Sequence, residues 1–141
     1  MVIHISKNGL HSLKKKGSYS DMIKVNEDNY TITIIRGDSG YVTVPLVEVT
    51  NNEQGEPVES EYVLQEGEIL RFAAAKKWGA TEEECFIIRE IPHETQRLYF
   101  YPEDTKNQKF GEYKYDLELT NSEGFVDTVL RSTLIIAEEV Y

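Results

Sequence analysis

The residue types that most often bind metals or act as nucleophiles are sparse in this chain of 141 residues. Its one cysteine, Cys85, and its three histidines, His4, His11 and His93, share no metal-ligand spacing, so a zinc site is not predicted. The sequence also lacks the G-x-S-x-G, P-loop, G-x-G-x-x-G and D-x-D-x-D-G motifs of hydrolases, nucleotide sites and calcium loops. We therefore predict no catalytic residue, no metal and no cofactor.

Two further features resemble functional motifs but have simpler explanations. Arg36-Gly37-Asp38 is an adhesion tripeptide in other proteins, yet glycine and aspartate are also the residues that a tight turn requires. Cys85 begins the apolar run Cys85–Ile88, and no histidine flanks it to lower the pKa of its thiol. We interpret Arg36–Asp38 as part of a turn and Cys85 as a small buried side chain.

Charge is distributed unevenly along the chain. The formal net charge is −10, which disfavours nucleic acid as a partner because phosphates repel an acidic surface. Residues 1–24 are basic, with five lysines against Asp21, and Lys14, Lys15 and Lys16 are consecutive. We hypothesise that these lysines form an interface by docking on the acidic body or on a second copy, which would make a homo-oligomer. The alternative is a solvated terminus.

Length and composition are typical of one globular domain that buries its own core. No apolar run approaches the roughly 18 residues needed to cross a bilayer, and the start of the chain is too short and polar for a signal peptide. We therefore expect a protein that is made in a cytoplasm and does not bind a membrane.

Alternation of apolar and polar residues predicts short strands separated by turns, without a long amphipathic helix. The clearest strand is Glu112–Leu119, which is followed by a turn at Thr120–Gly124 and by a second strand at Phe125–Ala137. The other predicted strands are Tyr30–Ile35, Tyr41–Val49, Glu68–Lys77, Glu84–Ile91 and Leu98–Tyr101. This series predicts an all-β antiparallel sandwich of about seven strands in residues 30–141, preceded by a basic arm or extension in residues 1–29.

Pairing and burial can also be predicted for part of this sandwich. We expect the first two strands to pair as a hairpin across the tight turn at Arg36–Gly40. In the strand at Glu68–Lys77, the alternation places Leu70, Phe72 and Ala74 in the core.

The connection Asn51–Gly67 is predicted to be an exposed loop. Seven glutamates occur from Glu48 to Glu68 without one lysine or arginine, and we expect at most a short edge strand at Tyr62–Leu64. Thr81–Glu84 is interpreted as a polar bend or, alternatively, as one helical turn with Thr81 as its cap.

Three stretches of the chain share a pattern with one protein family. They are Leu98–Glu139, with PEDT, FGEYKYDLELTNSEGFVDTV and EEV; Ile32–Val44, ITIIRGDSGYVTV; and Leu64–Lys77, LQEGEILRFAAAKK. This pattern resembles small β-sandwich proteins encoded in tail regions of phages and prophages of Gram-positive bacteria, similar to the amino-terminal immunoglobulin-like domain of upper baseplate proteins. The first 29 residues do not share it.

The resemblance implies a non-enzymatic structural or assembly subunit of a tail or baseplate, which contacts other tail proteins. It implies a protein made in the bacterial cytoplasm and carried in the virion tail. It also implies an immunoglobulin-like sandwich. In such domains a tyrosine near the start of the sixth strand bonds back to the preceding corner, two residues ahead of a core position.

Gly111, Tyr113 and Tyr115 fit this corner, with Tyr113 as the corner residue and Tyr115 where an antibody domain has a cysteine. The chain departs from the antibody pattern because it has no cysteine pair, and because Trp78 lies at the end of its strand and not in the middle. We interpret Trp78 as a candidate interface residue, or else as a cap on the edge of the core.

Two other classes of function stay open from the residues. One is an enzyme of unrecognised type, which would need a pocket with converging titratable groups, and the other is a binding module. A carbohydrate- or receptor-binding module would present several aromatic side chains together on its surface. The candidates are Tyr41, Tyr62, Trp78, Tyr99, Tyr101 and Tyr141.

Overall fold

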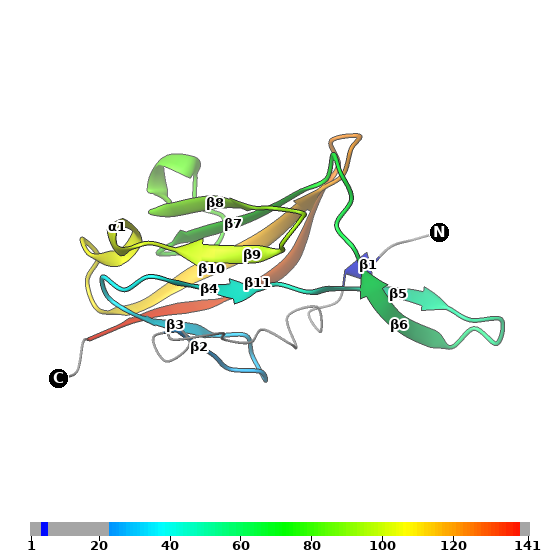
Figure 1. The fold of residues 1–141 in the computed structure, drawn as a ribbon, viewed down its shortest axis with the longest axis horizontal. Coiled ribbons are helices and arrows are strands. Elements are labelled where there is room, and N and C mark those ends of the chain that lie inside the picture. The colour runs from blue at the N-terminus through cyan, green and yellow to red at the C-terminus, as the bar shows by residue number, and fades with distance from the viewer. Residues whose placement is uncertain (1–3, 6–22, 139–141) are drawn as a thin grey trace.

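The computed structural model describes residues 4–5 and 23–138 (Figure 1). Its strands are β1 (His4–Ile5), β2 (Ile23–Val25), β3 (Ile32–Ile35), β4 (Gly40–Thr43), β5 (Leu46–Asn51), β6 (Pro57–Tyr62), β7 (Ile69–Ala75), β8 (Ile87–Ile91), β9 (Arg97–Phe100), β10 (Gly111–Thr120) and β11 (Val126–Ala137). Two short helical turns, the 3-10 helix η3 (Glu82–Glu84) and α1 (Pro102–Thr105), complete the described elements. The expected all-β class is confirmed. None of the helices in these residues is long and apolar enough to cross a bilayer.

A six-stranded sheet forms the main layer, in the order β2-β3-β11-β10-β7-β8. All its neighbours are antiparallel except β3 and β11, which run parallel with Leu134 opposite Ile32. The expectation of a wholly antiparallel fold of about seven strands was therefore wrong. Nine of the eleven described strands lie within residues 30–141, and the sheet is mixed because β3 lies beside β11 instead of pairing with β4.

The antiparallel pair β4 and β9 covers one face of this sheet. Val42, Leu98 and Phe100 of the pair are almost fully buried, and they share one core with the inward side chains of the six-stranded sheet. The ring centroids of Phe100 and Phe72 lie 5.7 Å apart, in an edge-to-face arrangement. Packing between two layers therefore fills the interior with apolar side chains.

Strand alternation determines which side chains enter this core. Leu70, Phe72 and Ala74 of β7 are buried as expected. The even alternation of β10 buries its apolar side chains on the same inner face and leaves its charged side chains on the outer face. Three of the charged outer residues of β10, Lys114, Asp116 and Glu118, line the pocket described below.

The predicted hairpin of the first two strands was wrong. β3 pairs with β2 and β11, whereas β4 pairs with β9 in the other layer. The turn between them carries the chain from one layer to the other. Gly37 has a φ of +83° there, and its N–H donates to Thr105 Oγ1 at 2.8 Å. The same turn residues serve a hairpin or a crossing, so the sequence did not distinguish the two.

The expected loop at Asn51–Gly67 also needs correction. Most of it belongs to a hairpin in which β5 and β6 pair from Leu46 opposite Tyr62 to Asn51 opposite Pro57. Figure 1 shows this hairpin projecting away from the body of the protein. We call residues 46–62 the acidic arm. Glutamates suggested a loop because they favour solvent, but backbone pairing does not require apolar side chains.

Two interactions hold the base of the acidic arm. Tyr62 donates its hydroxyl to both carboxylate oxygens of Glu68, at 2.6 and 2.7 Å. Gln96 donates from Nε2 to Val44 O at 2.8 Å, and Val44 N donates to Gln96 O at 2.7 Å. The β4–β9 layer is thereby joined to the start of the arm.

The segment expected as an arm, residues 1–29, is described in part. Ile23 is 1% exposed, and β2 pairs with β3, so residues 23–25 belong to the six-stranded sheet. The expected boundary between residues 29 and 30 falls between two paired strands. Lys14, Lys15, Lys16 and Tyr141 lie outside the described residues.

Candidate functional site

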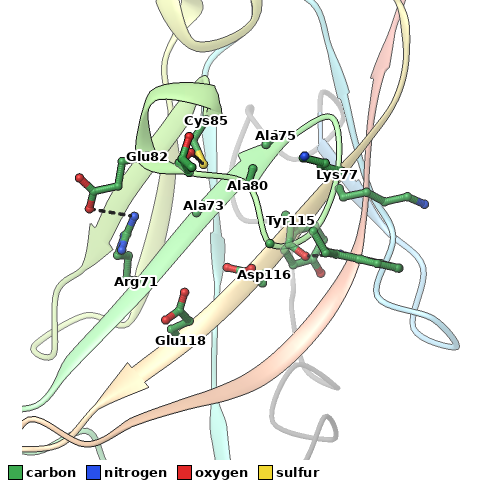
Figure 2. Close-up of a pocket in the computed structure, with 14 residues that line it drawn as sticks. Arg71, Ala73, Ala75, Lys77, Ala80, Glu82, Cys85, Tyr115, Asp116 and Glu118 are labelled. Carbon is green, nitrogen blue, oxygen red and sulfur yellow. Dashed lines mark hydrogen bonds and ion pairs between the residues drawn. The ribbon is translucent and has the colours of Figure 1, made fainter.

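A pocket of about 270 Å³ lies on the outer face of the six-stranded sheet, away from the core (Figure 2). Ala73 and Ala75 of β7 and Asp116 of β10 contribute to its floor, with Ala73 directly opposite Asp116 in the ladder. The segment from residue 77 to residue 85 forms its wall. The small alanine side chains on β7 leave room for the pocket. The longer charged side chains of the neighbouring strand β10 border it.

Trp78 fixes this wall. Its indole N–H donates to two backbone carbonyls on neighbouring strands, Tyr115 O at 3.1 Å and Ser132 O at 3.2 Å. The Lys114 ammonium lies 4.9 Å from the centroid of the indole ring. Gly79 follows with a φ of +74°, which allows the chain to turn back. Trp78 is 42% exposed and lies on the outer face of the sheet, beside the pocket.

The far side of the wall is the short helix η3. Thr81 N donates to Glu84 Oε1 at 2.9 Å, so the expected helical turn with Thr81 at its start is confirmed. This hydrogen bond lowers the pKa of Glu84, with a smaller contribution from the Lys77 charge. Burial raises the pKa of the Cys85 thiol, whose Sγ lies 3.3 Å from Thr81 O, so the neutral thiol is favoured.

The charged groups of the pocket are incompletely paired. Arg71 Nη2 lies 3.5 Å from Glu82 Oε1. Arg71 Nε and Asp116 Oδ1 are both shielded from solvent, and neither has a hydrogen-bond partner. Figure 2 shows Arg71 reaching toward Glu82, with Asp116 and Glu118 projecting from the adjacent strand. Burial, and then repulsion from Glu118, raises the pKa of Asp116, although two arginines oppose this shift.

This arrangement is suited to binding. Within residues 4–5 and 23–138, no group of three histidine, cysteine, aspartate or glutamate side chains could hold a metal ion. The pocket offers hydrogen-bond donors and acceptors beside its alanines. The raised pKa of the Cys85 thiol disfavours the reactive thiolate form. The pocket is therefore suited to binding a polar ligand.

A second candidate surface lies at the end of the body from which the acidic arm projects. Thr120 of β10 pairs with Ile69 on one side and Val126 on the other, so these two side chains flank it on one face. The exposed apolar residues of this region, with their exposed fractions, are Val63 (57%), Ile69 (43%), Phe125 (67%) and Val126 (55%). Figure 1 shows the β10–β11 turn beside the segment that joins β6 to β7. We call these four residues the end patch.

Tyrosines gather on the outer face of the β4–β9 layer. Tyr41 pairs with Tyr99 across the strands, with ring centroids 5.5 Å apart, and Tyr99 stacks with Tyr101 at 6.4 Å. The Arg97 guanidinium carbon lies 4.6 Å from the centroid of Tyr41. Three of the six aromatic candidates are thus brought together, whereas Tyr62 and Trp78 lie elsewhere.

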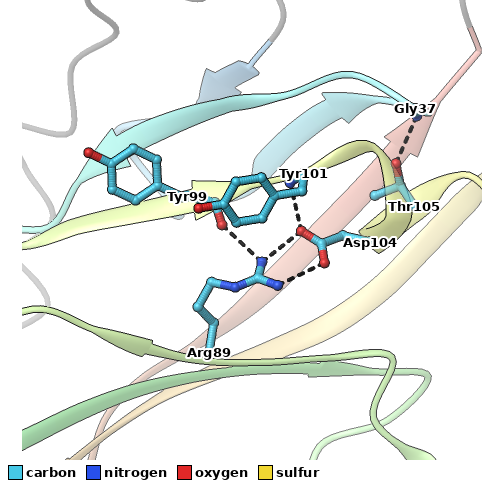
Figure 3. A network of polar contacts seen from close by, with 6 residues as sticks. All are labelled: Gly37, Arg89, Tyr99, Tyr101, Asp104 and Thr105. Atoms are coloured by element: carbon cyan, nitrogen blue, oxygen red, sulfur yellow. Dashed lines mark hydrogen bonds and ion pairs between the residues drawn. The ribbon is translucent and has the colours of Figure 1, made fainter.

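A polar network supports this tyrosine row (Figure 3). Arg89 of β8 donates to both carboxylate oxygens of Asp104, at 2.6 and 2.9 Å, and to Tyr99 O at 2.9 Å. Tyr101 N donates to Asp104 Oδ2 at 2.7 Å. The hydrogen bonds to Asp104 raise the pKa of Arg89 despite its partial burial. The network therefore ties the edge of the six-stranded sheet to the second layer.

The three residues expected at the structural corner lie at the start of β10. Tyr113 donates its hydroxyl to Lys109 O at 2.7 Å, four residues upstream. Tyr115 is buried and donates to Tyr30 O at 2.6 Å. Gly111 has a φ of +141°, a conformation that favours glycine.

Sequence reasoning missed Arg71 and Asp116, which come from strands more than 40 residues apart. It also missed the pairing of Arg89 with Asp104. The available signal was a charged residue at an inward position, since Arg89 lies between the buried Ile87 and Ile91. An isolated charge at a core position predicts a partner, but it does not identify that partner.

Comparison with known proteins gives no match. No family model, no curated protein and no solved structure matches the chain. The functional argument therefore rests on the geometry above.

Proposed function

We propose that the chain is a non-enzymatic assembly subunit that binds neighbouring proteins through the acidic arm and the end patch. A phage or prophage tail or baseplate is the setting that its sequence resemblance favours. In that setting the chain is made in the bacterial cytoplasm and incorporated into the virion tail. Its partners are other tail proteins or further copies of itself.

The proposal includes an immunoglobulin-like origin for the body. In variable-type domains, strands G, F, C and C′ are neighbours in one sheet, while B and E pair in the other. The order β11-β10-β7-β8 and the separate β4–β9 pair support this assignment. The Tyr113 hydroxyl contact with Lys109 O supports it further, because β10 then corresponds to strand F.

This assignment bears on function. In variable domains the B–C and F–G loops lie together at the recognition end. Here the acidic arm lies between β4 and β7, in the position of the B–C loop, and the β10–β11 turn takes the position of the F–G loop. The end patch lies where these two connections meet, which supports recognition of another protein at this end.

The observation that carries the proposal is the exposure of the acidic arm. Every residue of β6 from Pro57 to Glu61 is exposed, and among the described strands β6 pairs with another strand on one side only. β6 is also the last strand of the β1-β5-β6 sheet, and within the described residues no strand pairs with its outer edge. A partner that covered the unpaired edge of β6 and the exposed valine side chains would stabilise the arm.

The partner's chemistry follows from this surface. The four apolar residues of the end patch would form the centre of an interface, and the glutamates of the arm would form an acidic rim. Such an interface fits a protein that presents apolar side chains surrounded by lysine or arginine. Charged residues on β6 also disfavour unselective strand pairing, so the edge would accept basic strands in preference to others.

A shortened variant tests the proposal. Leu46 and Tyr62 are directly paired at the base of the arm. Replacing residues 47–61 by Asn-Gly would therefore remove the rest of β5 and β6 and connect this pair through a two-residue turn. No residue of 47–61 belongs to the buried core, so the body should stay folded. The measurement is co-purification with proteins encoded by adjacent genes, together with sedimentation velocity of the chain alone.

The expected result is that the intact chain self-associates or retains a neighbour and that the shortened chain does neither. A variant carrying Glu59→Lys and Glu61→Lys keeps the hairpin length but reverses the charge of the rim, and it should bind more weakly. If the intact chain stays monomeric and retains no neighbour, the assembly function is rejected. If the shortened chain binds as well as the intact one, the arm is rejected as the interface.

A further inference from the structure

The end of the body opposite the acidic arm carries an exposed aromatic side chain among cations. Phe110 is 44% exposed, and the Arg36 guanidinium carbon lies 4.1 Å from the centroid of its ring. Lys106 and Lys109, in the segment between α1 and β10, are exposed as well. Figure 1 shows α1 and the acidic arm at opposite ends of the longest axis of the protein. We call Arg36, Lys106, Lys109 and Phe110 the basic patch.

Hydrogen bonds hold the basic patch in one arrangement. Arg36 N donates to Ala137 O at 3.0 Å, and Arg36 Nη1 donates to Gln108 O at 3.4 Å. The Tyr113 hydroxyl donates to Lys109 O at 2.7 Å. The turn after β3 and the segment before β10 are therefore fixed against each other, so a partner would order little of this surface when it binds.

Lysine and arginine are unevenly placed between the two ends. None occurs from residue 37 to residue 70 or from residue 115 to residue 130, and these two ranges contain the acidic arm and the whole end patch. Residues 105–110, by contrast, include two lysines and no acidic residue. Glu103 and Glu112 flank this segment in the sequence, so its positive charge is local.

The two ends are complementary in charge and in apolar content. The acidic arm and the end patch fit a surface with an apolar centre and a basic rim, and the basic patch has that composition, with Phe110 at its centre. The arm itself carries five glutamates. Two arms would repel each other, so a second copy would not bind arm to arm.

We propose that the acidic arm and the end patch of one copy bind the basic patch of a second copy. This inference rests on the proposed function and names the chain itself as a partner. Phe110 packs on the end patch, while Lys106 and Lys109 lie against glutamates of the arm. Because the two surfaces differ, each bound pair still has one free arm and one free basic patch. Copies therefore add head to tail into a ring or a filament.

Sedimentation velocity of the full chain, from about 10 μM to about 1 mM, tests the proposal. We expect species larger than a dimer as the concentration rises, and weaker association in added NaCl. Lys109→Glu should weaken this association about tenfold. Lys24→Glu is the matched control, because it changes the net charge equally at an exposed residue of β2 outside the basic patch, and it should change the association less than about twofold.

A mixing experiment identifies the two surfaces that meet. The shortened chain, in which Asn-Gly replaces residues 47–61, lacks the arm and keeps the basic patch. A variant with Lys106→Glu and Lys109→Glu keeps the arm and loses the patch. Each alone should stay monomeric, and an equal mixture should form a one-to-one complex and nothing larger, because only one contact can form. Thermal unfolding verifies that both variants are folded.

Three results would overturn the proposal. One is a full chain that stays monomeric at about 1 mM; if it still retains a neighbour through its arm, the assembly function stands and the self-docking fails. Another is association that stops at a dimer, which would indicate one surface meeting its own copy. The third is equal weakening by Lys109→Glu and Lys24→Glu, or a mixture without a complex, because either would place the contact elsewhere.

Discussion

Arg89 and Asp104 form a two-bond ion pair between the last strand of the six-stranded sheet and the short helix that follows β9. The Asp104 side chain is 9% exposed and the Arg89 side chain 25% exposed, so the pair is largely removed from water. Asp104 also accepts from Tyr101 N. The pair therefore fixes the second layer against the first at the edge where no strand pairing joins them.

Replacing Asp104 by alanine should destabilise the protein by about 3 kcal/mol, because it leaves a partly buried guanidinium without its partner. Chemical denaturation measures this loss. Glu103→Ala, at an exposed position of the same helix, is the control and should change stability by less than about 0.5 kcal/mol. A similar loss for both variants would show that the helix matters and the ion pair does not.

The hydroxyl of Tyr113 should contribute through its bond to Lys109 O. Tyr113→Phe keeps the ring, which packs on Phe86 with centroids 4.9 Å apart, and removes the donor. We expect a loss of about 1 kcal/mol in the free energy of unfolding. An unchanged denaturation midpoint would mean that water replaces the lost donor and that the corner does not depend on this bond.

Asp116 should reduce stability at neutral pH. Burial and repulsion from Glu118 raise the pKa of its carboxyl above the ordinary value of 3.8, so the folded state holds this proton more tightly than the unfolded state. The resulting penalty is absent below the unfolded pKa, and it is fully present once pH exceeds the folded pKa. Asp116→Asn should therefore be more stable than the unchanged chain at pH 7, with the difference shrinking as pH falls toward 3.

Melting temperatures measured across this pH range check the prediction. The opposite sign, with Asp116→Asn less stable at pH 7, would show that the two arginines compensate the carboxylate fully.

The indole N–H of Trp78 should anchor the wall of the pocket. Trp78→Phe removes the donor that serves Tyr115 O and Ser132 O, and we expect it to cost about 1 kcal/mol. Phe125→Leu, at an aromatic residue that is 67% exposed, should cost much less in the same thermal unfolding experiment. If the two substitutions lowered the melting temperature equally, the loss of stability at Trp78 would not come from its indole hydrogen bonds.

Much of the fold follows from local pattern. The alternation in β7 correctly predicted the buried Leu70, Phe72 and Ala74, because the side-chain period of a strand is fixed by its backbone. The helical turn after Thr81 was one of two interpretations of a polar segment, and the structure contains that turn. These predictions needed no knowledge of which strands are neighbours.

Pairing between distant strands could not be predicted in this way. The parallel contact of β3 with β11 joins residues about 100 positions apart, and a turn at Arg36–Gly40 is compatible with either outcome. The pocket depends on the same information, since Ala73 and Asp116 become neighbours only through the register of β7 and β10. The paired β6 was missed because exposed glutamates carry no sign of a backbone partner.

The most direct test of the assembly function is hydrogen exchange of the β6 amides, in the isolated chain and in the complex with the neighbour that it retains. In the isolated chain these amides should exchange roughly a hundredfold faster than those of β10. In the complex we predict slow exchange for the amides of residues 58–62 and of the turn at residues 121–125. Protection confined to other parts of the body, with β6 still exchanging freely, would contradict the proposed interface.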